Sequence, residues 1–318
     1  MALFNDYKEM VRSGVIGHAI GDALGVPVEF SYRGTLKKHP VKDMTGYGVH
    51  DVPAGTWSDD TSMEIALMQS LIDKGRFDYD DIMKNFVRWT HGEFTATGKM
   101  FDIGGTCSQA ISNYRYGDAP LDCGIKTGHC NGNGSLMRIL PVALICYHNH
   151  IDKDQDRYAL VRDVSSLTHA HEISVLGCYI YVNYICHLLD GDSLTEAYDK
   201  MQRHNYLMFS DQARAEYDRV LNGDIYICDE YEIESGGYVR DSLEAALWCL
   251  LNNKTYHETV LAAVNLGDDT DTVAAIAGSM AGLYYGYNGM PIKWIFGLGR
   301  YEYLLDLCDK FAETDISV

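Results

Sequence analysis

Apolar residues recur at intervals of three and four wherever a period can be read along the chain. The longest such stretch covers residues 173–188, and shorter ones cover 63–71, 241–251 and 272–280. This spacing places the apolar side chains on one face of an α-helix. Alternation with period two, which marks a half-buried strand, is almost absent. The pattern therefore predicts an all-α protein.

Nothing in the sequence divides the chain into separate units. It contains no linker, internal repeat or low-complexity stretch, and only 6 of its 318 residues are proline. Residues 210–237 form the most polar and least periodic region, which we expect to be an insertion with local structure. Residues 1–318 are therefore expected to form a single compact domain, larger than most single-core domains.

Glycines are spaced every four residues in two of the expected helical regions. Gly17, Gly21 and Gly25 form one such series, and Gly278 with Gly282 repeats the spacing near the C-terminus. On a helix, each series makes a smooth stripe that a second backbone can approach closely, although glycine costs about 1 kcal/mol relative to alanine. The first series does not match G-x-G-x-x-G and follows no strand, which argues against a dinucleotide-binding fold.

The net charge limits the possible ligands. The chain has 26 Lys and Arg residues against 45 Asp and Glu residues, a formal charge of −19. This charge repels nucleic acids and anionic membrane surfaces, so neither is an expected partner. Any anionic ligand must instead be held by local features, such as metal ions or helix N-termini.

Cysteine usage and hydropathy predict a cytoplasmic location. The 9 cysteines are odd in number and contain no C-x-x-C pair, which suits free thiols in a reducing compartment. The first residues lack the pattern of a secretory signal. The most apolar run, 176–189, contains Asn183 and His187 and is shorter than a membrane-spanning helix requires. We expect a monomer with no membrane association.

Two acidic clusters, at 55–61 and 267–272, carry the main chemical signal. Each places carboxylates and hydroxyls just before an expected apolar helix. Helix N-capping explains one or two such residues. The second cluster, however, has three Asp within four positions, namely Asp268, Asp269 and Asp271. Their mutual repulsion indicates that a cation lies among them.

The side chains of the clusters are hard oxygen donors, which favour Mg²⁺, Mn²⁺ or Ca²⁺ over zinc. An EF-hand is excluded because the twelfth position counted from Asp269 is Met280, and from Asp271 it is Gly282. If the two clusters meet in space, they offer enough oxygen atoms for two metal ions.

A second interpretation of the 267–272 cluster is a phosphatase motif. Residues 269–273 match the D-x-D-x-[TV] pattern of haloacid-dehalogenase-like phosphatases. That fold requires a strand before the motif and further motifs after it. Only 45 residues follow Val273, and the strand–helix alternation is missing. The phosphatase interpretation is therefore weaker than the two-metal one.

Six motifs in order resemble the ADP-ribosylglycohydrolase family, which includes dinitrogenase-reductase-activating glycohydrolases and ADP-ribosyl-acceptor hydrolases. The resemblance covers most of the chain, from Gly14 to about Trp294. The motifs are Gly21–Phe30, Trp57–Thr61, Asp102–Gly104, Gly132–Arg138, Leu167–His171 and Asn265–Thr272.

The resemblance implies a compact orthogonal helical bundle with a cleft that holds two Mg²⁺ or Mn²⁺ ions. Its metal ligands would be Ser58, Asp59, Asp60, Asp269, Asp271 and Thr272. Ser58 replaces the Thr of some family members, and both residues supply a hydroxyl oxygen. Asp268 stands where relatives often have Gly, so we expect it to lie outside the ligand set.

The resemblance also implies which residues contact substrate. Glu29 and Asp60 are the candidates for the catalytic acid or base, and the residues alone leave the choice between them open. The expected substrate contacts are Asp102, Gly104, Thr106, Gly132, Asn133, Gly134, Ser135, His169 and Tyr238. For residues 132–135 the alternative is a simple turn with an N-cap, and for Tyr238 it is ordinary packing. Arg138 either assists at the site or forms a structural ion pair, and His171 is expected to be structural.

The implied activity is metal-dependent hydrolysis that removes ADP-ribose from a modified protein side chain, with arginine as the first candidate. Serine-linked, O-acetyl and nucleobase-linked ADP-ribose remain open, because all share the ADP-ribose half. Two further alternatives are a non-catalytic ADP-ribose-binding protein and a phosphohydrolase. The expected partners are accordingly an ADP-ribosylated protein or a small ADP-ribose conjugate.

Overall fold

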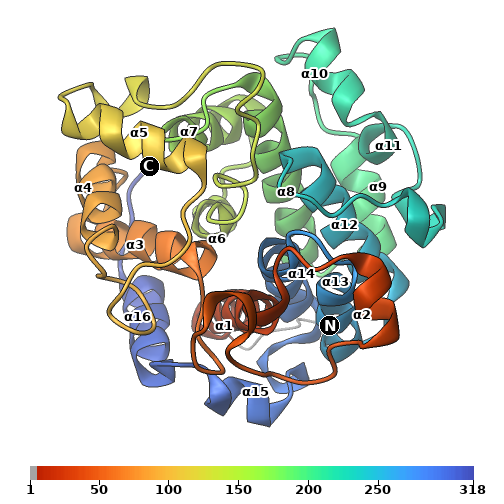
Figure 1. Cartoon of the computed structure of the whole chain (residues 1–318). Helices are drawn as coiled ribbons and strands as arrows, with labels where there is room; N and C mark the ends of the chain where they lie inside the picture. Colours follow the sequence, from red (N-terminus) through yellow and green to blue (C-terminus); the bar gives the residue numbers. More distant parts are fainter. Residues whose placement is uncertain (1–5) are drawn as a thin grey trace.

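The computed structural model describes residues 6–318, and this part of the chain is α-helical, with isolated bridges as its β pairing (Figure 1). The prediction of an all-α protein is confirmed. The α-helices are α1 (Tyr7–Gly25), α2 (Arg33–Lys38), α3 (Asp59–Lys74), α4 (Tyr79–Trp89), α5 (Gly105–Arg115), α6 (Leu140–His148), α7 (Asp154–Ser166), α8 (Glu172–Leu189), α9 (Leu194–Gln202), α10 (Asp211–Glu216), α11 (Asp218–Leu221), α12 (Val239–Asn252), α13 (Tyr256–Asn265), α14 (Thr270–Tyr285), α15 (Ile292–Gly297) and α16 (Tyr301–Glu313).

Helices α1 and α14 form the centre of the fold and pack more extensively on each other than any other pair. The predicted glycine stripe makes this possible. A Cβ atom on Gly21 would lie 1.9 Å from the carbonyl oxygen of Ala274, and one on Gly25 would lie 2.3 Å from the Cα of Asp271. The missing side chains therefore bring α1 against the first turns of α14, where the second acidic cluster lies.

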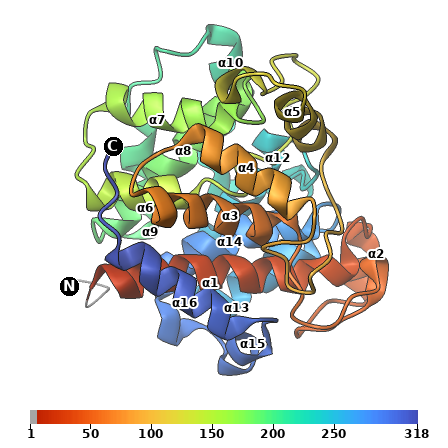
Figure 2. The same ribbon diagram turned by 90° about the vertical axis from the view of Figure 1, so that its left-hand side faces the viewer.

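The other helices surround this central pair. Helix α16 runs beside α1, and α3 packs on α4 and α16 (Figure 2). Helices α12 and α13 cover α14, while α8 contacts α6, α7, α9 and α12. The arrangement brings the first turns of α3 and α14 to the same region of the molecule.

Helix α8 is long and apolar enough to be a candidate membrane span by length and composition. It contains the 176–189 run and begins earlier, at Glu172. In the fold, however, 89% of the helix is buried among its neighbours. The apolar surface of α8 therefore forms part of the hydrophobic core.

All four helical stretches predicted from periodicity lie within helices, namely α3, α8, α12 and α14. The polar region 210–237 folds locally, as expected. It forms the short helices α10 and α11 and two 3₁₀ turns, Ile225–Ile227 and Glu230–Glu232.

Candidate active site and metal centre

The two acidic clusters meet at the N-termini of α3 and α14. The hydroxyl of Thr272 donates a hydrogen bond to Asp60 Oδ2 at 3.2 Å, and the hydroxyl of Ser58 donates to the same oxygen at 3.0 Å. Asp60 and Thr272 are 212 positions apart in the chain. Close packing of α1 against α14 thus gathers the clusters into one buried group.

The N-terminus of α3 is capped mainly by Asp22, which lies on α1. The Asp22 carboxylate accepts hydrogen bonds from the backbone N–H groups of Ser58 at 2.9 Å and Thr61 at 3.0 Å. It also accepts one from the Thr61 hydroxyl at 2.6 Å. Because another helix supplies these bonds, the carboxylates of Asp59 and Asp60 are not needed for capping.

Helix capping accounts for little of the second cluster either. Asp269 is the N-cap residue of α14, but its side chain accepts no hydrogen bond from that helix. Its Oδ2 instead accepts a hydrogen bond from the Asn133 side chain at 2.8 Å. The capping interpretation therefore applies to Ser58, whose hydroxyl accepts from the Asp60 backbone N–H at 3.3 Å.

The buried carboxylates have unsatisfied oxygen atoms. Within residues 6–318, Asp60 Oδ1 and Asp271 Oδ2 have no hydrogen-bond partner. No Lys or Arg in the same range pairs with an acid of either cluster at this site. Burial, followed by repulsion from neighbouring carboxylates, raises the pKa of Asp59, Asp60 and Asp271 well above the usual range. Buried anionic oxygens without partners are costly unless a cation binds them.

The set of donor atoms fits hard divalent cations. One carboxylate oxygen each from Glu29, Asp269 and Asp271 lies within 4.8 Å of the others, and hydroxyls of Ser58 and Thr272 are adjacent. Oxygen-only donor sets of this kind suit Mg²⁺, Mn²⁺ or Ca²⁺. The acidic clusters can therefore bind metal ions.

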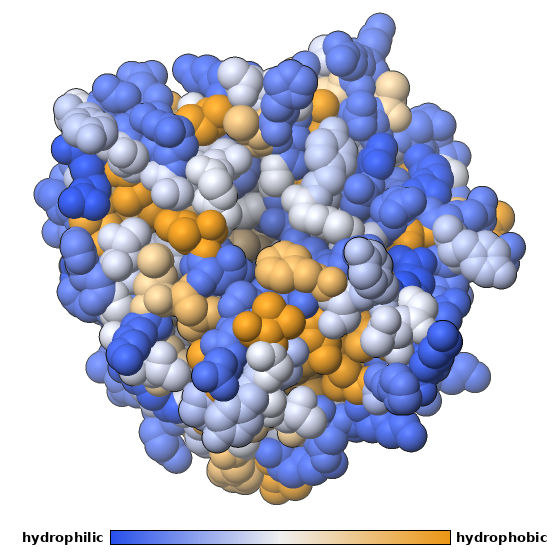
Figure 3. Space-filling model, in the orientation of Figure 1, coloured by the Kyte–Doolittle hydropathy of each residue, from blue (hydrophilic) through white to orange (hydrophobic). Residues whose placement is uncertain are grey.

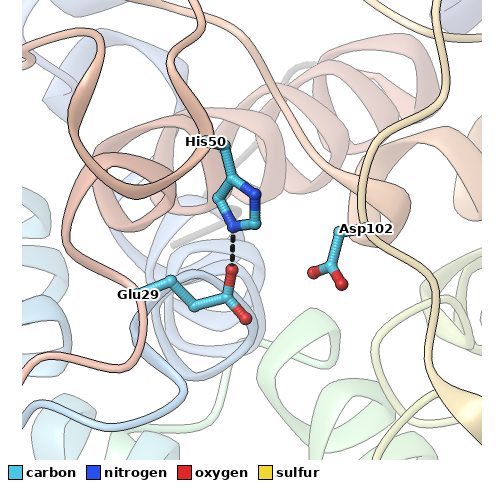
Figure 4. Close-up of side chains that lie close together, drawn as sticks. All are labelled: Glu29, His50 and Asp102. Atoms are coloured by element: carbon cyan, nitrogen blue, oxygen red, sulfur yellow. Dashed lines mark hydrogen bonds and ion pairs between the residues drawn. The ribbon is translucent and has the colours of Figure 1, made fainter.

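Glu29 lies close to two further residues, His50 and Asp102 (Figure 4). The His50 ring nitrogen Nε2 is hydrogen-bonded to Glu29 Oε2, and Asp102 points toward the pair from a separate loop. Burial raises the pKa of Glu29 to about 9, with added repulsion from Asp102 and the cluster carboxylates. The pKa of Asp102 is raised by burial as well.

Backbone pairing holds the loop of Glu29 against the second cluster. The N–H of Phe30 donates to the Asp268 carbonyl at 2.7 Å, and the N–H of Asp268 donates to the Ser31 carbonyl at 2.9 Å. Phe30 and Asp268 both adopt left-handed backbone angles, with φ of 62° and 58°, and so does Asp102, with φ of 56°. Such conformations are uncommon for residues other than glycine, and they often mark functional sites.

A cavity of about 330 Å³ opens beside the clusters, on a face that is hollowed near its centre (Figure 3). Its wall contains many of the residues predicted from the sequence. Among them are Glu29, Asp59, Asp269 and Thr272 from the acidic group, and Asp102, Gly104, Thr106, Gly132, Asn133, Gly134 and His169 from the expected substrate contacts. Asp60, Asp271 and Ser58 are buried directly behind this wall.

The glycine-rich loop 132–135 crosses the cavity wall next to His169. A Cβ atom on Gly134 would lie 2.9 Å from the His169 ring, so a larger residue at this position would displace the ring. The backbone N–H of Asn133 donates to the Gly237 carbonyl at 3.1 Å, which fixes the loop against the segment that leads into α12. Burial and the nearby Arg138 charge lower the pKa of His169 to about 3, so its imidazole is neutral.

Two expected contact residues lie away from the cavity wall. The Ser135 hydroxyl is fully buried and accepts a hydrogen bond from Ser165 at 3.0 Å. The Tyr238 ring lies next to Arg240, and its hydroxyl donates to Glu216 at 3.3 Å. Direct substrate contact by these two residues stays a prediction.

The structure corrects the expectation for Arg138. Its guanidinium is fully buried over the Phe86 ring and donates to the Thr168 hydroxyl at 2.8 Å. Neither an ion pair nor a position on the cavity wall is seen for Arg138 among the described residues. By contrast, His171 has the expected structural role, because its side chain accepts the backbone N–H of Ile173 as the N-cap of α8.

Sequence reasoning assigned no role to Asp22 and His50. Asp22 lies inside the glycine stripe, where a carboxylate on an otherwise buried helix could have signalled a special function. The short stretch around His50 contains no comparable signal, because its position beside Glu29 depends on how a distant loop folds back.

Comparison with known proteins gives a consistent result. A sequence model described as ADP-ribosylglycohydrolase matches residues 4–317. The chain is 33% identical over 310 residues to "ADP-ribosylarginine hydrolase Tri1" of Serratia proteamaculans, covering 95% of this chain and 78% of that protein. It is 29% identical to "ADP-ribosyl-[dinitrogen reductase] glycohydrolase" of Rhodospirillum rubrum, with 88% and 87% covered.

A solved structure titled "ADP-ribosylglycohydrolase-related protein complex" is similar across the whole fold. It superposes with a TM-score of 0.82 at 29% sequence identity, and the match covers 98% of this chain and all of that one.

Proposed function

The chain belongs to the ADP-ribosylglycohydrolase family, and on that premise we propose that it is a hydrolase that releases ADP-ribose from arginine side chains of modified proteins. The observation that carries the proposal is the meeting of the two acidic clusters at one cavity. Hydrolysis breaks the bond between the ribose anomeric carbon and the guanidine nitrogen. Water supplies the hydroxyl group to the sugar, and the departing nitrogen takes up a proton.

We propose that two divalent ions, Mg²⁺ or Mn²⁺, are held by Ser58, Asp59, Asp60, Asp269, Asp271 and Thr272. The partnerless oxygens of Asp60 and Asp271 support this assignment. Ions bound there would orient the ribose hydroxyls and polarise the attacking water.

The remaining wall residues bind and orient the nucleotide. In the loop 132–134, the backbone N–H groups of Gly132 and Gly134 would contact the diphosphate, which suits an anion in a protein of net charge −19. His169 is neutral and buried and accepts or donates one hydrogen bond at the sugar, with its other nitrogen bonded to the Thr168 hydroxyl at 2.8 Å.

Glu29 is the better candidate for the proton-transfer group. It lines the cavity, whereas Asp60 lies behind the wall and already accepts two hydroxyl hydrogen bonds. Burial raises the pKa of Glu29, which favours the protonated carboxyl form that can deliver a proton to a leaving nitrogen. We therefore assign the acid role to Glu29 and the metal-holding role to Asp60.

The charge of the cavity supports arginine as the acceptor. Four carboxylates line it, from Glu29, Asp59, Asp102 and Asp269, and no Lys or Arg of the described chain does so. A modified guanidinium group remains cationic, so it gains attraction from Asp102, the lining acid that is neither a proposed metal ligand nor the proposed proton donor. The serine-linked and O-acetyl conjugates have neutral acceptors and gain none.

A parallel assay tests this proposal. The protein is incubated with equal concentrations of arginine-linked, serine-linked, O-acetyl and nucleobase-linked ADP-ribose, and free ADP-ribose is measured. The arginine conjugate should give the highest kcat/KM. Binding of ADP-ribose without turnover of any conjugate would instead identify a non-catalytic binding protein. We further propose that the whole chain acts as one domain, which the match over residues 4–317 supports.

A further inference from the structure

A second group of metal-binding side chains lies at the opposite end of α8 from the cavity. It surrounds His187, which by helix geometry is about 22 Å along the axis from the first residue of α8. A separate cavity of about 380 Å³ is lined by Asp152, Asp154, His187, Lys200, Arg203 and His204. None of these residues lines the cavity of the candidate active site.

Hydrogen bonding fixes the protonation of the two histidines. His204 Nδ1 lies 2.7 Å from Asp154 Oδ1, so it must carry a proton and donate it to the carboxylate. His204 Nε2 lies 2.8 Å from His187 Nε2. With both rings neutral, His187 Nε2 donates to His204 Nε2, and His187 Nδ1 keeps a bare lone pair.

The bare nitrogen faces two carboxylates. His187 Nδ1 lies 3.7 Å from Asp190 Oδ2 and 3.8 Å from Asp192 Oδ2, and it is buried without a hydrogen-bond partner in the described chain. All three ligand atoms lie within 4.8 Å of one another. The His187 lone pair and the Asp190 carboxylate have no proton to share with each other, so a cation between them would satisfy both.

The spacing suits a tetrahedral ion. Ligands bound to Zn²⁺ at about 2.0–2.2 Å are about 3.3–3.6 Å apart in tetrahedral geometry. The two separations from His187 Nδ1 exceed this by only a few tenths of an ångström, which a side-chain rotation can close. One imidazole and two carboxylates leave the fourth position to water.

The surroundings favour a cation as well. Asp190 is the C-cap of α8, so the site lies at the negative end of the helix dipole. Asp152 and Asp154 in the cavity wall are matched by Lys200 and Arg203 in the same wall, so the attraction for a cation comes from the helix end and from Asp190 and Asp192. The one direct competitor is Lys200, whose ammonium contacts both oxygens of Asp192 at 2.6 and 2.7 Å. Its side chain is 47% exposed and free to swing away.

We propose that His187, Asp190 and Asp192 form a second metal site that binds a divalent transition-metal ion of the Zn²⁺ type. The ion would tie the end of α8 to the turn that leads into α9. Through the hydrogen bond between His187 and His204, it would also stabilise the segment that follows α9.

Zinc titration of the full chain tests the proposal. Calorimetry is performed with ZnCl₂ in excess Mg²⁺, so that the acidic clusters of the active site are occupied. Asp190→Asn changes an exposed ligand and leaves the fold intact, while Asp199→Asn changes an exposed Asp on α9 as the matched control. We expect Asp190→Asn to weaken one Zn²⁺-binding event by more than about 100-fold. This loss of affinity is larger than that expected for a residue that only hydrogen-bonds to a metal ligand. Asp199→Asn should bind as the wild type does.

Two more measurements make the result decisive. Lys200→Met removes the competing ammonium and should tighten the same binding event about tenfold or more. Crystals soaked in zinc should show an anomalous peak between His187 and Asp190. Identical isotherms for Asp190→Asn and Asp199→Asn, or zinc peaks confined to the active-site cavity, would overturn the proposal.

Discussion

The hydroxyl of Thr272 donates a hydrogen bond to the carboxylate of Asp60, 212 positions earlier in the chain. Each residue lies in the first turn of its helix, so this bond joins the N-termini of α14 and α3. This contact brings the acidic residues at the N-termini of α3 and α14 together into one group of buried carboxylates. The proposed chemistry of the protein depends on this arrangement.

The first prediction separates a metal ligand from a neighbouring acid of equal charge. Asp269→Asn removes a proposed ligand charge and should lower kcat by more than about 100-fold on an ADP-ribosylated arginine peptide, since the other ligands cannot replace it. Asp268→Asn is the control, because Asp268 is exposed and asparagine tolerates its left-handed backbone. Both variants should melt cooperatively. Equal activity in the two variants would remove Asp269 from the ligand set.

The second prediction concerns the cap that α1 supplies to α3. Asp22→Ala leaves three buried donors of Ser58 and Thr61 unsatisfied and should lower the free energy of unfolding by at least about 3 kcal/mol. Asp6 caps its own helix at the surface, with a 2.8 Å bond from the Glu9 N–H. Asp6→Ala should cost about 1 kcal/mol. Urea denaturation measures both values, and a smaller loss for Asp22→Ala than for Asp6→Ala would contradict the cap.

The third prediction concerns the close approach of α1 and α14. A methyl group at position 21 overlaps the Ala274 carbonyl, so Gly21→Ala should destabilise the fold by about 2–3 kcal/mol or more. Gly34 lies in α2 with open space around it, and Gly34→Ala should leave stability unchanged or raise it by up to about 1 kcal/mol. Thermal melts of both variants distinguish the outcomes, and equal melting temperatures would show that the helices are not in tight contact.

The fourth prediction is a pH dependence of the metal-free protein. The pKa of Glu29 rises from its ordinary value of 4.5 to about 9 on folding, so the folded state binds more protons than the unfolded state between these values. The contribution of Glu29 to the free energy of unfolding is therefore fully present below pH 4.5 and is lost as the pH rises toward 9. Asp59, Asp60 and Asp271 contribute with the same sign, because burial raises their pKa values as well.

The test of this dependence is a series of melts in EDTA from pH 7 to pH 9. His18 and His169 act with the opposite sign, but their pKa values of about 3 place that effect below pH 7. The melting temperature should fall across the series. Mg²⁺ should restore it more at pH 9 than at pH 7, and Glu29→Gln should flatten the slope. A melting temperature that rises with pH in EDTA would refute the arrangement of buried acids.

Much of the fold follows from local pattern, which is why the sequence predicts it. The periodic stretches correspond to α3, α8, α12 and α14, and the spacing of Gly21 and Gly25 predicts a close helix contact. The repulsion among clustered Asp residues also predicts a cation without reference to the structure. These inferences require only neighbouring residues and elementary electrostatics.

Other features depend on tertiary contacts that no local pattern encodes. Asp22 caps a helix that begins 37 positions later, and His50 reaches Glu29 only because its loop folds back. Arg138 shows the reverse case, because it belongs to the motif next to the substrate loop but its side chain is fully buried and lies off the cavity wall. Sequence alone gives its place in the chain but not the direction in which the side chain points.

Anomalous diffraction from crystals grown with Mn²⁺ tests the central claim most directly. The account predicts strong manganese peaks in contact with the carboxylates of Asp60, Asp269 and Asp271, beside the cavity that Glu29 lines. Crystals that contain no manganese within bonding distance of these carboxylates, while the enzyme remains active in EDTA, would contradict it.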